Sequence, residues 1–186
     1  MRINDNDIIE VSGQQFRVNF EDEYYPEYPW DNDDGCGIVR RSNKPHRDGQ
    51  SDKKPGERPL NQAGSNEYQF YFDWQAAMKK AKADGWNTEP YDAPNKTLRA
   101  VEQNFDYLRG FINGDWCYLS VTVTMVDEFG NDMDEYSDSL GMVESFRDYH
   151  ISTAYDMVEE IARQFANDAE KEKQSRRFND AMACGV

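Results

Sequence analysis

WCYLSVTVTMVDE, residues 116–128, is the stretch that decides the fold class. Every second residue from Cys117 to Met125 is apolar, and polar or aromatic residues stand between them. A period of two with one apolar side predicts a β-strand that buries one face. The sequence EFGND that follows predicts a turn, so we expect a second antiparallel arm near Tyr136–Leu140.

Three segments on the N-terminal side of this strand also have strand character. Residues 7–20, DIIEVSGQQFRVNF, predict two short strands about a Ser-Gly turn. YQFYFDW, residues 68–74, predicts a strand that runs directly into a helix. GIVRR, residues 37–41, is a further candidate strand.

Three segments show the apolar spacing of amphipathic helices. Asp73 is expected to cap a first helix that stops near Gly85, and a second helix is expected over Thr97–Asn113. The third begins near His150, and its apolar stripe continues to Ala169. Strands and helices thus come in mixed blocks without a regular alternation.

We therefore expect an α+β fold, with an antiparallel sheet of four to five strands and about three helices packed on one face. A chain of 186 residues suits one core, and we expect a single domain over residues 1–170. Residues 41–66 contain little to bury and predict a mobile basic loop. Residues 171–186 lose the apolar stripe and are expected to fray.

The charge of the chain restricts its partners. The net charge is −15, with 36 Asp and Glu against 21 Lys and Arg. Phosphates and anionic lipid headgroups would be repelled, which argues against direct binding of nucleic acid or of a membrane surface. The three cysteines have no C-x-x-C spacing, and no apolar segment is long enough to be a signal or a span, so a soluble protein of a reducing cytoplasm is expected.

YPWDNDDGCGIV, residues 28–39, is the segment that most resembles a site of chemistry. Counted from Asp31 as an EF-hand loop, it has Gly35 at position five and Ser42 at position twelve, so the calcium pattern fails. Cys36 with His46 or His150 would make a nucleophilic pair, but a small apolar role for Cys36 is the stronger interpretation. No catalytic motif is present, and we expect no enzyme activity, no catalytic residue, no metal and no cofactor.

Two runs of carboxylates contain no cation. They are Glu21, Asp22, Glu23, Glu27, Asp31, Asp33 and Asp34 in the first run, and Asp127, Glu128, Asp132, Asp134, Glu135 and Asp138 in the second. Residues 40–58, by contrast, carry a net charge of +4 and would be a second contact or a flexible arm. A stiff array of carboxylates can occupy the DNA-binding groove of another protein, although a charge run is often only a solvated face. Tyr28 and Trp30 are added to the predicted partner-binding residues because aromatic residues are frequent at binding hot spots, and packing of a strand end is an equally good account of them.

Several motifs resemble one family. They are YPWDNDDGCGIV, KKPGERPL, YFDWQAAMKKAKADGW, FDYLRGFINGDWCYLSVTV and DSLGMVES, which together span most of residues 15–146. This pattern resembles a family of small, uncharacterised tailed-phage proteins that share a PW-D/E-x-x-DG-x-G-x-V corner and a YLRG-x-x-N-x-x-W segment. The family often has His in place of Cys36, which weakens a catalytic role for that thiol. The resemblance implies a phage origin and brings no known activity.

Together these observations favour a phage-encoded acidic inhibitor of the anti-CRISPR or anti-restriction type. It would bind a host nucleic-acid-binding protein or defence complex in the bacterial cytoplasm, by DNA mimicry. The alternatives are a small metal-dependent phage enzyme or accessory factor that uses the corner at 31–37, and a non-enzymatic regulatory phage protein. The oligomeric state is left open.

Overall fold

The computed structural model describes residues 3–23, 28–31, 36–45, 52–61, 68–88 and 94–183. The chain divides into two compact units. Unit 1 comprises Met1–Tyr24 and Cys117–Val186, and unit 2 comprises Tyr25–Trp116. The α+β class is confirmed, since the described residues form antiparallel sheets together with α-helices. The single domain expected over residues 1–170 is instead these two units, with the second inserted into the first.

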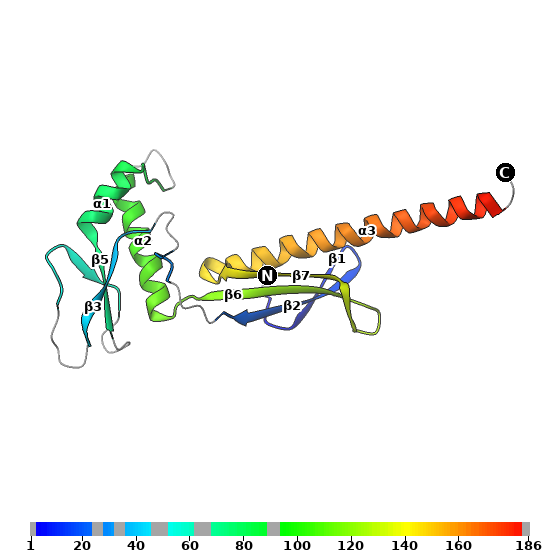
Figure 1. The fold of residues 1–186 in the computed structure, drawn as a ribbon, viewed down its shortest axis with the longest axis horizontal. Coiled ribbons are helices and arrows are strands. Elements are labelled where there is room, and N and C mark those ends of the chain that lie inside the picture. Colours follow the sequence, from blue (N-terminus) through cyan, green and yellow to red (C-terminus); the bar gives the residue numbers. More distant parts are fainter. Residues whose placement is uncertain are drawn as a thin grey trace. The chain divides into compact units, whose positions relative to one another are not determined.

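Unit 1 is a four-stranded antiparallel sheet with a long helix (Figure 1). The strand order is β1 (Asp7–Val11), β2 (Gln14–Asp22), β6 (Tyr118–Val126) and β7 (Asp132–Glu144). A short 3-10 turn, Phe146–Asp148, leads into the helix α3 (Tyr149–Ala183). The two short strands expected about a Ser-Gly turn are confirmed as β1 and β2, and the stretch that decides the fold class is confirmed as β6.

The core of unit 1 lies between the sheet and the first half of α3. It is formed by every second residue of the strands and by helix residues spaced three or four apart, which lie on the sides that face each other. Its buried members include Phe16 and Val18 of β2, Val121, Val123 and Met125 of β6, and Ala154, Met157, Val158 and Ile161 of α3. The opposite face of the sheet is polar, with hydroxyl pairs such as Thr122 with Ser139 across β6 and β7.

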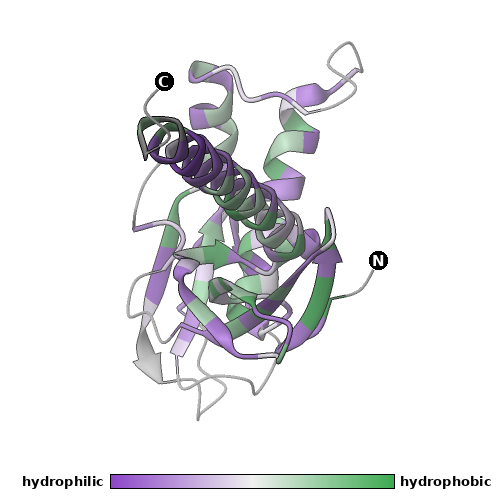
Figure 2. Ribbon diagram, turned by 90° about the vertical axis from the view of Figure 1, so that its right-hand side faces the viewer, coloured by the Kyte–Doolittle hydropathy of each residue, from purple (hydrophilic) through white to green (hydrophobic). Residues whose placement is uncertain are grey.

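The second half of α3 extends beyond the hydrophobic core of unit 1. Phe165 is the last helix residue that packs on the core, and residues 169–180 are exposed. Figure 2 shows hydrophilic residues predominating toward this end of the helix. The fraying expected for residues 171–186 is wrong for 171–183, which are helical. Side-chain ion pairs one turn apart, such as Asp168 with Lys171 at 2.8 Å, favour the helix there.

Unit 2 contains a three-stranded antiparallel sheet and two helices. The strand order is β3 (Val39–Pro45), β5 (Tyr68–Asp73) and β4 (Glu57–Pro59), and the helices are α1 (Trp74–Ala83) and α2 (Lys96–Asn113). The expected passage from strand into helix is confirmed, because the Asp73 carboxylate accepts a hydrogen bond from the Ala76 N–H at 2.9 Å.

The single sheet of four to five strands is replaced by two sheets, and the helices are shared between the units. Spacing of apolar residues shows that a segment is a strand but not which strand it pairs with. The loop expected over residues 41–66 is also partly wrong, because β3 reaches Pro45 and β4 spans Glu57–Pro59. Residues 46–51 and 62–67 of that loop lie outside the described residues.

Candidate interaction surface

The negative charge of the protein is concentrated on unit 1. This unit has 21 Asp and Glu against eight Lys and Arg, a net charge of −13. Unit 2 has 15 against 13, a net charge of −2. The second half of α3, residues 168–183, has four residues of each sign, so the sheet and the first half of α3 carry the excess.

The two acidic runs do not form one continuous array. In the strand register, Glu21 lies opposite Ser120 at the start of β6, and Asp132 lies opposite Val126 at its end. Six residues of strand separate these positions by ~20 Å. Asp138 lies opposite Val123, midway between these positions, so the second run extends along β7 from the far end of the sheet to its middle.

The first run is also divided between the units. Glu21, Asp22 and Glu23 belong to unit 1, Asp31 belongs to unit 2, and Glu27, Asp33 and Asp34 lie outside the described residues. The Glu23 carboxylate accepts a hydrogen bond from the Met142 N–H at 3.1 Å. Glu23 thus serves to join the end of β2 to β7, and the predicted surface at residues 21–34 is not assembled by the described residues.

The second run lies on the β6–β7 hairpin, where its turn is closely hydrogen-bonded. Asp127 Oδ1 accepts from the N–H groups of Phe129 and Asn131, each at 2.8 Å, and Asp127 Oδ2 accepts from Asn131 Nδ2 at 3.0 Å. The bonds from Asn131, with those from the turn backbone, lower the pKa of the Asp127 carboxyl. Gly130 takes a positive φ of 81°, which allows the tight reversal.

Arg17 of β2 holds the same turn from the neighbouring strand. Its Nη2 donates to the Gly130 carbonyl at 3.1 Å, its Nε donates to Asp132 Oδ1 at 2.9 Å, and its Nη1 donates to Asn6 Oδ1 at 3.2 Å. The guanidinium neutralises Asp132 and fixes the base of the turn. Arg17 cannot be recognised from the sequence as a turn residue, because the contact joins positions more than a hundred residues apart.

The remaining acidic side chains of the hairpin point to solvent. Glu128, Asp134, Glu135 and Asp138 are exposed, and none of them has a described ion-pair partner. Phe129, between Glu128 and Gly130, is 81% exposed. Phe129 was not among the predicted partner-binding residues, although an aromatic residue inside the polar turn EFGND is a signal visible in the sequence. The hairpin is therefore an ordered, negatively charged projection with an aromatic apex.

The aromatic residues of the first run have a packing role in unit 2. Tyr28 and Trp30 stack with their centroids 4.7 Å apart, and both rings pack against Phe70. The Gly37 N–H donates to Asn104 Oδ1 at 2.7 Å. This corner is anchored in the core of unit 2, which supports the packing account of Tyr28 and Trp30.

The described residues do not bring together a catalytic or metal-binding group at the corner. Cys36 is half-buried with its Sγ 3.6 Å from the Pro29 carbonyl oxygen, while His46 lies outside the described residues and His150 belongs to unit 1. Burial raises the pKa of the Cys117 thiol, so this cysteine is not an activated thiolate. Within the described ranges, no three His, Cys, Asp or Glu side chains are grouped as a metal site.

The basic segment 40–58 is partly neutralised inside unit 2. Arg40 forms a bidentate ion pair with Glu57, both nitrogen–oxygen distances being 2.8 Å, and its Nη1 donates to Asp52 at 3.1 Å. The Arg40 hydrogen bond lowers the pKa of the Glu57 carboxyl, which is 6% exposed. Arg58 lies over the Trp74 ring, 3.5 Å from its centroid. Arg40 is therefore a structural cation rather than a free contact for a partner.

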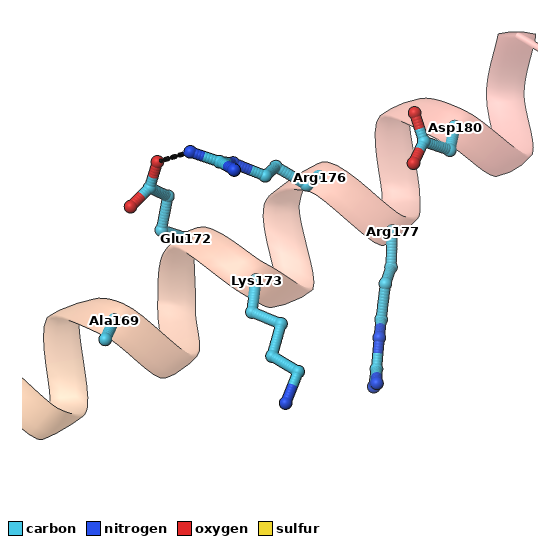
Figure 3. A pocket seen from close by; sticks show the side chains of 6 residues that line it. All are labelled: Ala169, Glu172, Lys173, Arg176, Arg177 and Asp180. Carbon is cyan, nitrogen blue, oxygen red and sulfur yellow. Dashed lines mark hydrogen bonds and ion pairs between the residues drawn. The ribbon is translucent and has the colours of Figure 1, made fainter.

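A surface depression of about 250 Å³ lies along the second half of α3 (Figure 3). Its lining residues, Ala169, Glu172, Lys173, Arg176, Arg177 and Asp180, all come from this one helix. A ligand there would be touched from one side, whereas small-molecule sites enclose most of their ligand. This depression is not a candidate active site.

Comparison of the chain with family models, with curated proteins and with solved structures found no match. None of the helices in the described part of the chain combines the length and the apolar composition that a membrane span needs. The candidate site therefore rests on the geometry and charge of unit 1.

Proposed function

We propose that this protein is a non-enzymatic binding protein whose unit 1 docks on a positively charged, nucleic-acid-binding surface of another protein. The observation that carries the proposal is the net charge of −13 on one compact unit, against −2 on the other. A phage-encoded inhibitor of a host defence complex is the form of this function that the family resemblance favours.

The negative charge of unit 1 would attract a positively charged surface of another protein and would disfavour partners of the same charge. At physiological ionic strength the Debye length is about 8 Å, so carboxylates spread over a sheet and a helix act together on a surface that approaches closely. A surface evolved to attract DNA would attract such a unit at an increased association rate. Because the first acidic run is divided between the two units and Asp132 is neutralised by Arg17, we propose competition for a basic surface and not a copy of the phosphate spacing of DNA.

Salt and DNA competition test this function. The tagged full-length protein would be used to purify its partner from phage-infected bacteria, and the affinity would then be measured between 50 and 300 mM salt with and without duplex DNA. We expect the affinity to fall at least ~10-fold over this range and duplex DNA to displace the protein, since the contact is between opposite charges. An affinity that is constant with salt, or unaffected by DNA, would contradict the proposal.

The corner of unit 2 supplies a matched control. Replacement of Asp31, Asp33 and Asp34 by Asn removes three charges from unit 2, and replacement of Glu128, Asp134 and Asp138 by amides removes three from unit 1. The first variant is expected to keep its affinity and the second to lose it. The reverse result would assign the function to the corner, as in the enzyme or accessory-factor alternative.

A further inference from the structure

Phe129 is the most exposed large apolar side chain among the described residues. It is 81% exposed, compared with 65% for Phe178 and 66% for Met182 on the second half of α3. It is not part of either hydrophobic core. Folding of unit 1 therefore gives no reason for an aromatic residue at this position.

The backbone beneath this side chain is held by several hydrogen bonds. The Phe129 N–H is bound by the Asp127 carboxylate at 2.8 Å, and the Gly130 carbonyl next to it is bound by Arg17 at 3.1 Å. The Asp127 N–H also donates to the Asn131 carbonyl at 2.9 Å, which closes the turn. An anchor on an ordered base loses less conformational freedom on binding than one on a loose loop.

The surroundings of Phe129 indicate the chemistry of the surface that would receive it. Glu128 precedes it, and Asp134, Glu135 and Asp138 follow along β7, all exposed. An aromatic anchor beside Glu128, at the turn of a hairpin whose outer strand carries further carboxylates, is complementary to an apolar pocket flanked by Lys and Arg side chains. An anionic membrane would accept the phenyl ring but repel the carboxylates.

We propose that the β6–β7 turn is the docking tip of the protein, and that Phe129 inserts into an apolar, Lys- and Arg-rimmed pocket of a partner protein. This rests on the proposed function and names its point of contact. Hot-spot contacts of this kind place much of the binding energy in one buried aromatic residue at the centre of an interface. The carboxylates of the hairpin steer the approach and exclude partners of the same charge.

The first test places a photo-crosslinking phenylalanine derivative at position 129 of the full-length protein in phage-infected bacteria. The same derivative at position 178 is the matched control, since Phe178 is also an exposed phenylalanine of unit 1. We expect one dominant protein adduct from position 129, weakened at high salt, and no such adduct from position 178. Absence of an adduct at 129, or an equal adduct at both positions, overturns the proposal.

The second test measures affinity for the crosslinked protein. Phe129→Ala is expected to weaken binding at least ~10-fold, while Phe178→Ala keeps it, and neither changes the thermal unfolding midpoint because both side chains are exposed. If Phe129→Ala binds normally while the amide variant at Glu128, Asp134 and Asp138 does not, the docking tip is refuted and the proposed function survives. If binding instead survives Phe129→Ala, the amide changes and high salt, the docking tip and the proposed function are both refuted.

A third measurement separates a protein partner from a lipid surface. Flotation of the full-length protein with vesicles of phosphatidylcholine, and of phosphatidylcholine with phosphatidylglycerol, is expected to leave it in solution. Binding to either vesicle that is lost in Phe129→Ala would assign the tip to a membrane and overturn the proposal.

Discussion

Unit 1 should fold after removal of unit 2, because the two ends of the insertion meet on neighbouring strands. The Glu23 N–H donates to the Tyr118 carbonyl at 3.0 Å, which continues the β2–β6 pairing in which Asp22 lies opposite Leu119. Replacing residues 24–117 by Asn-Gly would join β2 to β6 through a two-residue hairpin. The sheet then becomes a simple meander of four sequential strands followed by α3.

The change in the free energy of unfolding of unit 1 is the sum of two opposing contributions. Closing a connection of about 90 residues costs ~3 kcal/mol more chain entropy than closing one of two residues, if the insertion is unfolded in the reference state. The replacement also removes Cys117, whose N–H and carbonyl bind Ser145 at 2.9 Å each, at ~1 kcal/mol per bond. We expect the shortened unit 1 to be about as stable as in the full chain, or more stable by ~1 kcal/mol.

Spectroscopy can separate the two units in the full chain. All four tryptophans, Trp30, Trp74, Trp86 and Trp116, lie in unit 2, so tryptophan fluorescence reports on that unit. Urea unfolding of the shortened protein would be followed by far-UV circular dichroism, to which α3 contributes strongly, and by the dispersion of amide resonances. A transition without cooperativity, or collapsed amide dispersion, would refute the reasoning and show that unit 1 needs unit 2.

Two substitutions and one truncation test further parts of the fold, each by a change in stability or in a spectroscopic signal. Glu57→Gln should destabilise unit 2 by about 2 kcal/mol at pH 7, because it breaks the ion pair with Arg40. Folding lowers the pKa of the Glu57 carboxyl from 4.5, so the stabilisation from this ion pair is complete above pH 4.5 and is lost as the pH falls further. The difference in urea midpoint between the two proteins, followed by tryptophan fluorescence, should therefore shrink below pH 4.5. An equal difference at pH 3 would contradict this. Gly37→Ala would place a Cβ in steric conflict with the Phe72 ring and should destabilise unit 2 by about 2 kcal/mol, seen as an earlier fluorescence transition. An unchanged midpoint would mean that the corner can move to admit the methyl group. Truncation after Lys173 removes an exposed part of α3 and should lower the helical signal while changing the stability of unit 1 by no more than ~0.5 kcal/mol, so a clear loss of stability would reveal packing at that end.

The location of the candidate site could be predicted from the sequence, but the roles of its residues could not. The acidic hairpin and its six carboxylates could be located from residues 127–138, because the charge run and the turn are both local in the sequence. The roles of those carboxylates could not, since Asp127 binds its own turn while Asp132 is neutralised by Arg17. Tyr28 and Trp30 were grouped with the acids by sequence proximity, whereas packing places them against Phe70 in another unit.

The sequence by itself determined those helices and strands that have a clear local pattern: alternation predicts β6, apolar spacing predicts α2, and Asp73 sets the start of α1. It did not reveal β4 or the last turns of α3, which have no such pattern. Tertiary structure decided which strands pair, that residues 25–116 form their own unit, and that the first acidic run is divided between the two units. Those outcomes depend on free energies of packing between residues distant in the chain, which a period of two or of 3.6 does not encode.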